Sequence, residues 1–215
     1  MQTLSVRESI RFGWGTFKKR PWFFIGIVVL VVIISSVLTS IANAYQTGAF
    51  SFLLVLAVLA ANILIEMGLV SFALKAHDDA EEVSFQDLWH PMSFWKYVGV
   101  KILVALVVLI GLILLIIPGI IAALALLFAT YLVIDRGLGP IEAMKESLRI
   151  TKGNRWKLFL LVLAIVLINI VGVLALVVGL LVSVPVSLLA VVHAYRTLEH
   201  RASEVEIPVP APAAI

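Results

Sequence analysis

Long apolar stretches alternate with short polar segments along this chain. The stretches at residues 22–44 and 50–75 each exceed the roughly 20 helical residues that cross a hydrocarbon layer of about 30 Å. No stretch alternates polar and apolar residues with the period of a membrane β-barrel strand, so we expect helices. The pattern predicts an all-α polytopic membrane protein with six transmembrane helices, at about residues 22–44, 50–75, 97–117, 120–135, 157–177 and 181–198.

Three of the polar segments have the period of an amphipathic helix, and they cover residues 3–18, 84–95 and 139–155. A tryptophan stands at or just beyond the end of each segment, at positions 22, 95 and 156. Tryptophan favours the headgroup layer, which suits a helix that lies on the membrane before the chain enters it. We therefore expect three hairpins, each preceded by a cytoplasmic amphipathic interfacial helix.

The chain from residue 95 to 195 reads as two copies of one unit. Trp95 precedes Gly111 by 16 residues, and Trp156 precedes Gly172 by the same 16 residues. Both copies start with a surface helix on the same side, so the repeat is a parallel one rather than the inverted kind found in many transporters. The first unit, before residue 80, has nothing that matches these glycines.

Proline and glycine mark where the later spans are expected to break. Pro118 and Gly119 follow the third span, where proline removes a helical hydrogen bond and glycine permits a tight reversal. This leaves a short fourth span, from about residue 120. The apolar region from 156 to 198 is too long for one span, and we expect its two helices to meet between Gly179 and Pro185.

The basic residues predict the orientation. All 16 lysines and arginines fall on one side of the six-span arrangement. By the positive-inside rule this side, with both termini, is cytoplasmic. We expect the first span to be retained rather than cleaved as a signal peptide, because its apolar run is too long for one. Residues 1–201 then form a single membrane domain, and residues 202–215, which contain three prolines, are expected to be a disordered cytoplasmic tail.

Composition narrows the chemistry. The chain is 62% hydrophobic and 13% charged, and its net charge of +3 comes from basic residues beside apolar spans, so we expect no nucleic-acid partner. It has no cysteine, which excludes disulfides and thiolate sites. The acidic and histidine residues near position 80 match no metal-binding spacing, and no acid, base and nucleophile converge in sequence. We expect no metal, no cofactor and no enzymatic activity.

Polar residues inside the spans are the first candidate site. Glu66 lies about 13 Å from Lys75 at the helical rise, deep in the second span, and Asn62 lies one turn earlier. Asn169 has a comparable depth in the fifth span. Charge there is costly, so Glu66 should face the bundle, be paired or be protonated. Its role is either a proton or cation relay, or an interhelical clamp with a neutral carboxyl.

The third amphipathic segment is the second candidate site. Ile141, Met144 and Leu148 form its apolar stripe, and the remaining side is largely charged. Basic side chains here could hold anionic headgroups, at about 1 kcal/mol each near such a surface. They could equally serve only the orientation rule. The candidates are Lys145, Arg149, Lys152, Arg155 and Lys157.

Several short sequences resemble a known family. They are the words VSFQDLW at 83–89, IPGII at 117–121, DRGLGPIEA at 135–143 and ITKGNRW at 150–156. They resemble a bacterial family of six-span integral membrane proteins of unknown function, similar to the membrane domain that accompanies some glycerophosphoryl diester phosphodiesterases. The resemblance covers about residues 50–198. It implies a multi-pass protein of the bacterial cytoplasmic membrane and supplies no catalytic residue.

Two functions remain open from the sequence. The first is a non-enzymatic membrane module that interacts with lipid, anionic lipid included, or with partner proteins through its basic interfacial helices. The alternative is a small transporter or channel that uses Glu66, Asn62 and Asn169. A homo-oligomer or a membrane protein partner fits either function.

Overall fold

The computed structural model describes residues 4–44, 49–80, 83–84, 93–175 and 178–206. Every regular element in these ranges is a helix. The helices are α1 (Val6–Lys19), α2 (Pro21–Ala44), α3 (Ala49–Asp78), α4 (Phe94–Leu114), α5 (Ile116–Ala125), α6 (Ala129–Arg136), α7 (Pro140–Thr151), α8 (Arg155–Leu174) and α9 (Leu180–Glu206).

Six segments of the described chain are long and apolar enough to cross a membrane. They are Pro21–Ala44, Ser51–Asp78, Phe94–Leu114, Ile116–Arg136, Arg155–Leu174 and Leu180–Ser203. The all-helical fold and the six apolar segments are therefore confirmed. The arrangement as three hairpins with interfacial helices stays a prediction. Most of the predicted second amphipathic helix (84–95) and most of the tail lie outside the described residues.

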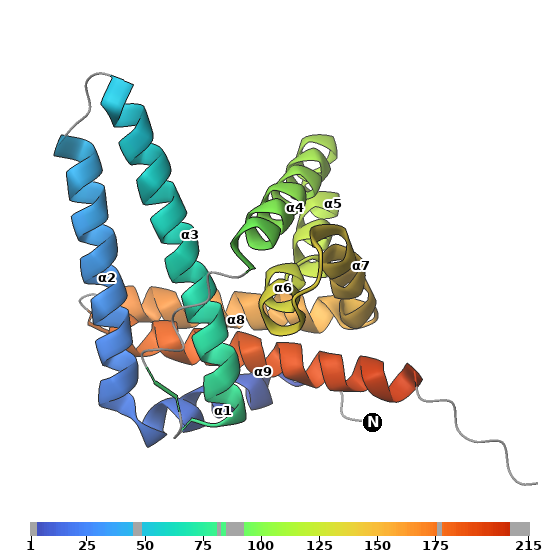
Figure 1. Cartoon of the computed structure of the whole chain (residues 1–215). Coiled ribbons are helices and arrows are strands. Elements are labelled where there is room, and N and C mark those ends of the chain that lie inside the picture. Colours follow the sequence, from blue (N-terminus) through green and yellow to red (C-terminus); the bar gives the residue numbers. More distant parts are fainter. Residues whose placement is uncertain (1–3, 45–48, 81–82, 85–92, 176–177, 207–215) are drawn as a thin grey trace, which may run out of the picture.

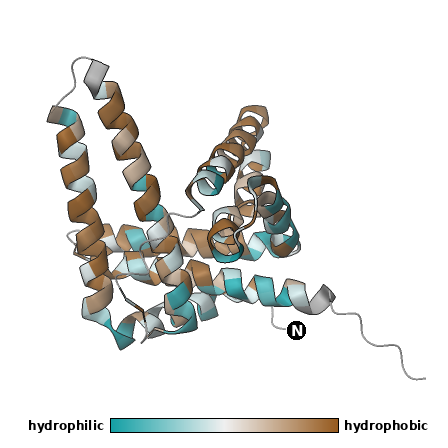
Figure 2. Cartoon of the chain, viewed as in Figure 1, coloured by the Kyte–Doolittle hydropathy of each residue, from teal (hydrophilic) through white to brown (hydrophobic). Residues whose placement is uncertain are grey.

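The long helices diverge from a common core. In Figure 1, α2 and α3 lie side by side and rise from the rest, while α8 and α9 lie side by side across their lower ends. Buried side chains from α3, α4, α6 and α8 meet around α9, where Tyr195 and Leu198 are buried. Figure 2 shows that hydrophilic residues gather at this lower level, whereas the projecting parts of α2 and α3 are hydrophobic. The core thus lies at the polar ends of the long helices.

Helix α1 packs on α9 through small side chains. Its N-cap is Ser5, whose hydroxyl accepts a hydrogen bond from the Glu8 N–H. The face turned to α9 includes Ser9 and Gly13, both buried. A Cβ on Gly13 would lie 2.4 Å from the Val186 carbonyl oxygen, so only glycine permits this approach. The large apolar side chain of Trp14 stays exposed.

The predicted helix breaks need correction. Helix α4 ends before Leu115, which has an extended backbone, and α5 starts at Ile116. Pro118 therefore lies in the first turn of α5, where its missing N–H does no harm, so it starts a helix rather than breaking one. The fourth span is consequently not short, because it begins at Ile116. Pro185 likewise lies inside α9 and does not end it.

Two pairs of glycines lie close to the junctions between consecutive helices. A Cβ on Gly111 would lie 2.9 Å from the Gly119 Cα atom, where α4 meets α5. A Cβ on Gly179 would lie 2.7 Å from the Gly172 Cα atom, where α8 meets α9. Gly111 follows Trp95, and Gly172 follows Trp156, by the same 16 residues in the sequence. Each lets the backbone of its helix touch the next helix.

Candidate functional site

Glu66 forms an ion pair that the sequence analysis missed. Its Oε2 atom contacts the Nζ atom of Lys101 on α4. The two side chains are 47% and 38% exposed, respectively, so the pair is not sealed between helices. The Lys101 Nζ atom also lies 5.8 Å from the centroid of the Tyr97 ring. Glu66 therefore links α3 to α4 as one of a pair of charges, which is one of the three arrangements expected from the sequence.

The other two intramembrane candidates do not join Glu66. The Asn62 side chain donates to the Val58 carbonyl oxygen, one turn back in α3. Asn169 connects α8 to α9: its Nδ2 atom lies 3.1 Å from the Ser187 Oγ atom, and its Oδ1 atom accepts from Ser183 at 2.8 Å. The predicted group of three is therefore divided between two places in the fold, and the Asn169 contacts are those of a helix clamp.

Helix α7 leaves part of its predicted apolar stripe exposed. Ile141 and Leu148 of the predicted apolar stripe are 62% and 41% exposed. The buried face consists of small, hydroxyl-bearing and β-branched residues, namely Ala143, Ser147, Ile150 and Thr151. Small and hydroxyl side chains allow a close approach and can bond to free backbone groups. Ile141 and Leu148 are thus left on the outer surface of α7, whereas Met144 packs against the buried core.

The buried hydroxyls of α7 form hydrogen bonds with backbone groups in the gap between α5 and α6. The Ser147 Oγ atom donates to the Ala125 carbonyl oxygen at 2.9 Å and accepts from the Phe128 N–H at 3.3 Å. The Thr151 hydroxyl also reaches the Ala125 oxygen, at 3.2 Å. A helix gap frees backbone groups that would be costly to bury without partners. Helix α7 supplies those partners.

A tight turn joins α7 to α8. Gly153 has a φ of +80°, a left-handed conformation that favours glycine. This turn leaves three residues, 152–154, between the two helices. It holds Lys152 next to the end of α7 and buries Asn154 at the start of α8. The turn thus keeps Lys152 close to the end of α7 and to the start of α8.

A basic pocket lies beside this turn, between α7 and α9. It has a volume of about 220 Å³, below the 300–1,000 Å³ common for whole small-molecule ligands, so it suits a headgroup or a phosphate. Three of its lining residues are cationic, and the full lining is Arg149, Ile150, Lys152, Asn154, Leu198, Arg201 and Ala202. Neither Lys152 nor Arg201 forms an ion pair with a side chain that the structure describes.

Only some of the predicted headgroup candidates line the pocket. Arg149 and Lys152 line it, whereas Lys145 and Lys157 do not. The guanidinium Nε atom of Arg155 is buried and has no hydrogen-bond partner among the described residues. Arg201 completes the pocket from α9, some 50 residues along the chain. No local pattern could have found it, because only the packing of α9 on α7 brings it there.

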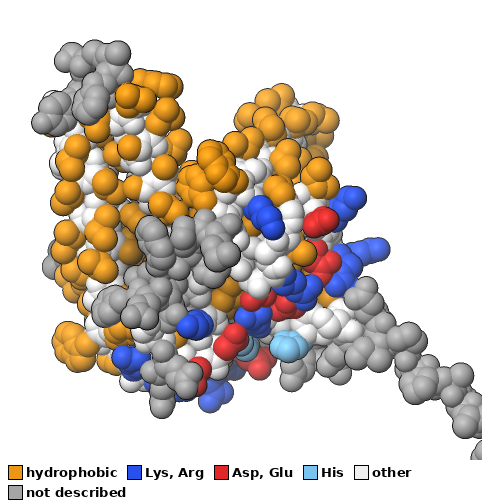
Figure 3. All heavy atoms as spheres, in the orientation of Figure 1, with side chains coloured by type: hydrophobic (Ala, Val, Ile, Leu, Met, Phe, Trp, Pro, Cys, Tyr) orange, Lys and Arg blue, Asp and Glu red, His pale blue; other side chains and the backbone are white. Residues whose placement is uncertain are grey.

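A network of ion pairs holds the pocket walls together. Arg196 on α9 contacts Asp135 at 2.8 Å and Asp78 at 2.8 Å, so α3, α6 and α9 are joined at one residue. Arg136 contacts Glu199 at 2.7 Å and Glu146 at 3.2 Å, which adds α7. Figure 3 shows charged side chains of both signs gathered in a band across the lower part of the molecule, below the two hydrophobic projections.

The histidines near this band also meet. The Nε2 atom of His77 on α3 lies 3.2 Å from the Nδ1 atom of His193 on α9. The Phe12 ring of α1 stacks on His193 at 4.4 Å between centroids. Sequence separation hid this contact, which joins three helices at the same level as the ion pairs.

The basic pocket and the ion pairs among α6, α7 and α9 lie in a stretch that the chain shares with other proteins. Residues 97–202 match a family described as "Protein of unknown function (DUF975)". The chain is also 29% identical to the uncharacterized protein Rv2560 of Mycobacterium tuberculosis over 165 residues. These residues cover 77% of this chain and 50% of that protein.

A second relative, the uncharacterized protein Mb2590 of Mycobacterium bovis, is 28% identical over 165 residues, which again cover 77% of this chain and 50% of that protein. The chain thus spans about half the length of the curated relatives it matches. No solved structure matches it. The predicted resemblance to a family of unknown function is confirmed in this form, and the family match covers α4 to α9.

Proposed function

We propose that the chain is a non-enzymatic membrane module that binds the headgroup of an anionic phospholipid at its cytoplasmic surface. The observation that carries the proposal is the pocket in which Arg149, Lys152 and Arg201 converge beside buried Asn154. Glu146 already engages Arg149 at 2.6 Å, whereas Lys152 and Arg201 supply the charge that a phosphate would meet. The exposed Ile141 and Leu148 on α7 would rest in the adjoining lipid.

The proposal places the protein in the bacterial cytoplasmic membrane, with six spans and both termini in the cytoplasm. What supports this is the set of six apolar helices, the bacterial relatives and the distribution of basic residues. The resemblance to the membrane domain of glycerophosphoryl diester phosphodiesterases stays a prediction, and lipid binding at the pocket does not depend on it.

The test is lipid binding by the full chain in detergent, measured by native mass spectrometry with phosphatidylglycerol and phosphatidylcholine. We expect Lys152→Gln and Arg201→Gln each to weaken phosphatidylglycerol binding about fivefold, because one charge near an anionic group contributes about 1 kcal/mol. Lys145→Gln is the matched control, since Lys145 is exposed on α7 but does not line the pocket. Equal binding of both lipids, or an equal loss in the control, would contradict the proposal.

A small transporter or channel is the second candidate, and the exposure of Glu66 favours it. Charged side chains in spanning helices usually face protein or water. Glu66 is 47% exposed and so is not covered by protein, which leaves water as the surroundings that would suit its charge. Because the chain lacks cysteine, one introduced thiol can report on water. Labelling of Asn62→Cys by a water-soluble thiosulfonate, at a rate near that of Lys145→Cys, would favour an aqueous path past Glu66. Protection of Asn62→Cys would rule this candidate out.

A further inference from the structure

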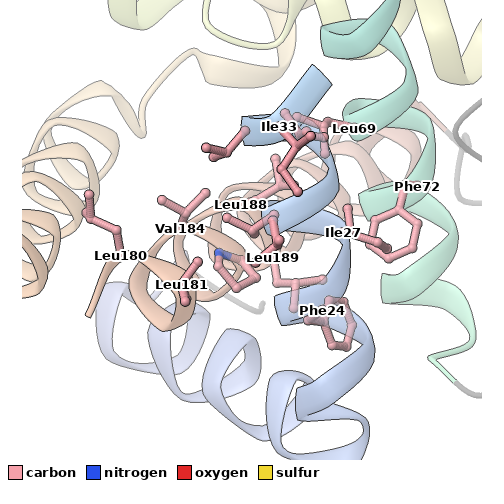
Figure 4. Close-up of a pocket in the computed structure, with 15 residues that line it drawn as sticks. Phe24, Ile27, Ile33, Leu69, Phe72, Leu180, Leu181, Val184, Leu188 and Leu189 are labelled. Carbon is pink, nitrogen blue, oxygen red and sulfur yellow. The ribbon is translucent and has the colours of Figure 1, made fainter. Parts of the chain in front are cut away.

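An apolar groove lies between α2, α3 and α9, away from the basic pocket. It has a volume of about 410 Å³, and all of its lining residues are apolar, including Phe24 and Ile33 of α2, Phe72 of α3, and Leu180 and Val184 of α9. Figure 4 shows these side chains directed toward a shared space, with Phe24 near its lower end and Ile33 near its upper end. The groove exists because α2 and α9 diverge above their contact.

The buried residues of α2 lie in its first turns. They are Phe24 and Ile27; Val31, one turn further on, is only partly buried, and Val29, Leu30 and Val32 are exposed. Beyond Ile27 the inward side of α2 is therefore only partly covered, and it borders a gap lined by apolar side chains. In a membrane such a gap is filled by hydrocarbon, because water gains no hydrogen bond there.

The length of the groove fits a single acyl chain. From Phe24 to Ile33 the helical rise of 1.5 Å per residue spans about 14 Å. A hydrocarbon layer of about 30 Å divides into two leaflets of roughly 15 Å. The groove is thus as long as one leaflet is thick, which is the length of one lipid tail.

The lower end of the groove adjoins a basic corner. Helix α1 ends at Lys19 and α2 begins at Pro21, so Lys18, Lys19 and Arg20 lie within two turns of Phe24. Lys18 and Lys19 are exposed. Arg20 lies over the Phe23 ring, with its guanidinium carbon 4.3 Å from the ring centroid, and donates to the Val83 carbonyl oxygen. An exposed cationic pair a few residues before Phe24, the first residue that lines the apolar groove, complements a phosphate joined to a hydrocarbon tail.

We propose that this groove holds one acyl chain of an anionic phospholipid from the cytoplasmic leaflet, with the lipid phosphate at Lys18 and Lys19. The site is separate from the pocket formed by Arg149, Lys152 and Arg201, and either can exist without the other. The lipid fills the space between α2 and α9 and so becomes part of the packing of the first helix pair.

The experiment is photolabelling of the full chain in nanodiscs by phosphatidylglycerol that carries a diazirine in its acyl chain, with the labelled peptides identified by mass spectrometry. We expect labels on α2 between residues 28 and 33 and on α9 between 181 and 188. Val184→Trp fills the groove and should lower this labelling roughly tenfold, the effect of about 1.4 kcal/mol. The matched control is Val166→Trp, an equally exposed position on α8 outside the groove, which should leave the labelling unchanged.

Competition on the wild-type chain keeps the test decisive if Val184→Trp does not fold. Unlabelled phosphatidylglycerol should displace the probe better than phosphatidylcholine, and Lys18→Gln with Lys19→Gln should abolish this difference. Equal labelling of Val184→Trp and Val166→Trp would show non-specific surface lipid and overturn the proposal. Equal competition by the two lipids would overturn the assignment to an anionic lipid. If phosphatidylglycerol binding were lost in Lys152→Gln while the groove labelling stayed unchanged, the result would concern only the basic pocket.

Discussion

The Ser147 hydroxyl on α7 donates a hydrogen bond to the Ala125 carbonyl oxygen, 2.9 Å away at the end of α5. The same hydroxyl accepts from the Phe128 N–H at 3.3 Å, just before α6 begins. A helix that looks from its sequence like a surface element therefore completes the backbone of a spanning segment. The basic pocket and the interrupted fourth span share one helix, so a ligand held by Arg149 and Lys152 would bear on α7 and through it on the gap.

Ser147→Ala should destabilise the protein. It would leave the buried Phe128 N–H without its partner, whereas Thr151 would still serve the Ala125 oxygen. We expect a loss of about 1–2 kcal/mol in the free energy of unfolding in mixed micelles. Ser203→Ala is the control, because Ser203 is exposed and bonds only within its own helix. Equal stability of the two variants would show that Ser147 does not hold the gap.

Gly119→Ala should be costly because of the contact between α4 and α5. A Cβ there would lie 2.7 Å from the Leu112 backbone nitrogen, which cannot move as a flexible side chain can. We expect a loss of about 1–3 kcal/mol, the usual cost of overpacking, seen as a lower melting temperature in detergent. In contrast, Gly26→Ala in α2 meets no atom within 4 Å and should be neutral or stabilising. A neutral Gly119→Ala would mean that α4 and α5 separate in the membrane.

The charges of Glu66 and Lys101 should be coupled. In Glu66→Gln, Lys101 loses the acid it contacts, and in Lys101→Met, Glu66 loses its base. We expect each change to cost about 1–2 kcal/mol, since a lone charge in a span is unfavourable and part of each side chain is exposed. The double variant should cost less than the sum of the two. Strict additivity in unfolding measurements would refute the pair, and it would restore the sequence-based view of a neutral clamp.

Glu146 should make the stability depend on pH. Its hydrogen bond from Arg149 lowers the pKa of the Glu146 carboxyl below its ordinary value of 4.5, and Arg136 adds to this although burial opposes it. A carboxyl whose pKa falls on folding adds stability above its unfolded pKa, and this stability is lost as the pH falls through the folded pKa.

The wild type should therefore exceed Glu146→Gln by a constant margin above about pH 5. The margin should shrink as the pH drops below 4.5, where the carboxyl takes up a proton. Unfolding of both proteins in detergent from pH 3 to 7 measures this margin. Parallel stability curves across the whole range would show that the ion pairs of Glu146 do not contribute.

The sequence determined the class of protein and much of its outline. Apolar stretches of the length of a membrane predicted the six helical segments, because burial of a backbone in lipid leaves few alternatives to a helix. Residues with strong local preferences also start helices: Ser5 caps α1, and Pro140 lies in the first turn of α7. The glycines at 111 and 172 stood out by spacing alone, although their purpose was hidden.

Tertiary structure decided the partners. Lys101 pairs with Glu66 from 35 residues away, and Arg201 joins Lys152 from 49 residues away; neither separation carries a periodic signal. The inner face of α7 was decided in the same way. The sequence showed an apolar stripe, and it did not show that the protein interior takes small and hydroxyl-bearing residues such as Ser147 while Ile141 and Leu148 stay outside. In this protein hydrophobicity alone does not tell the inner face of a helix from the outer, so the candidate sites emerged only from the packing.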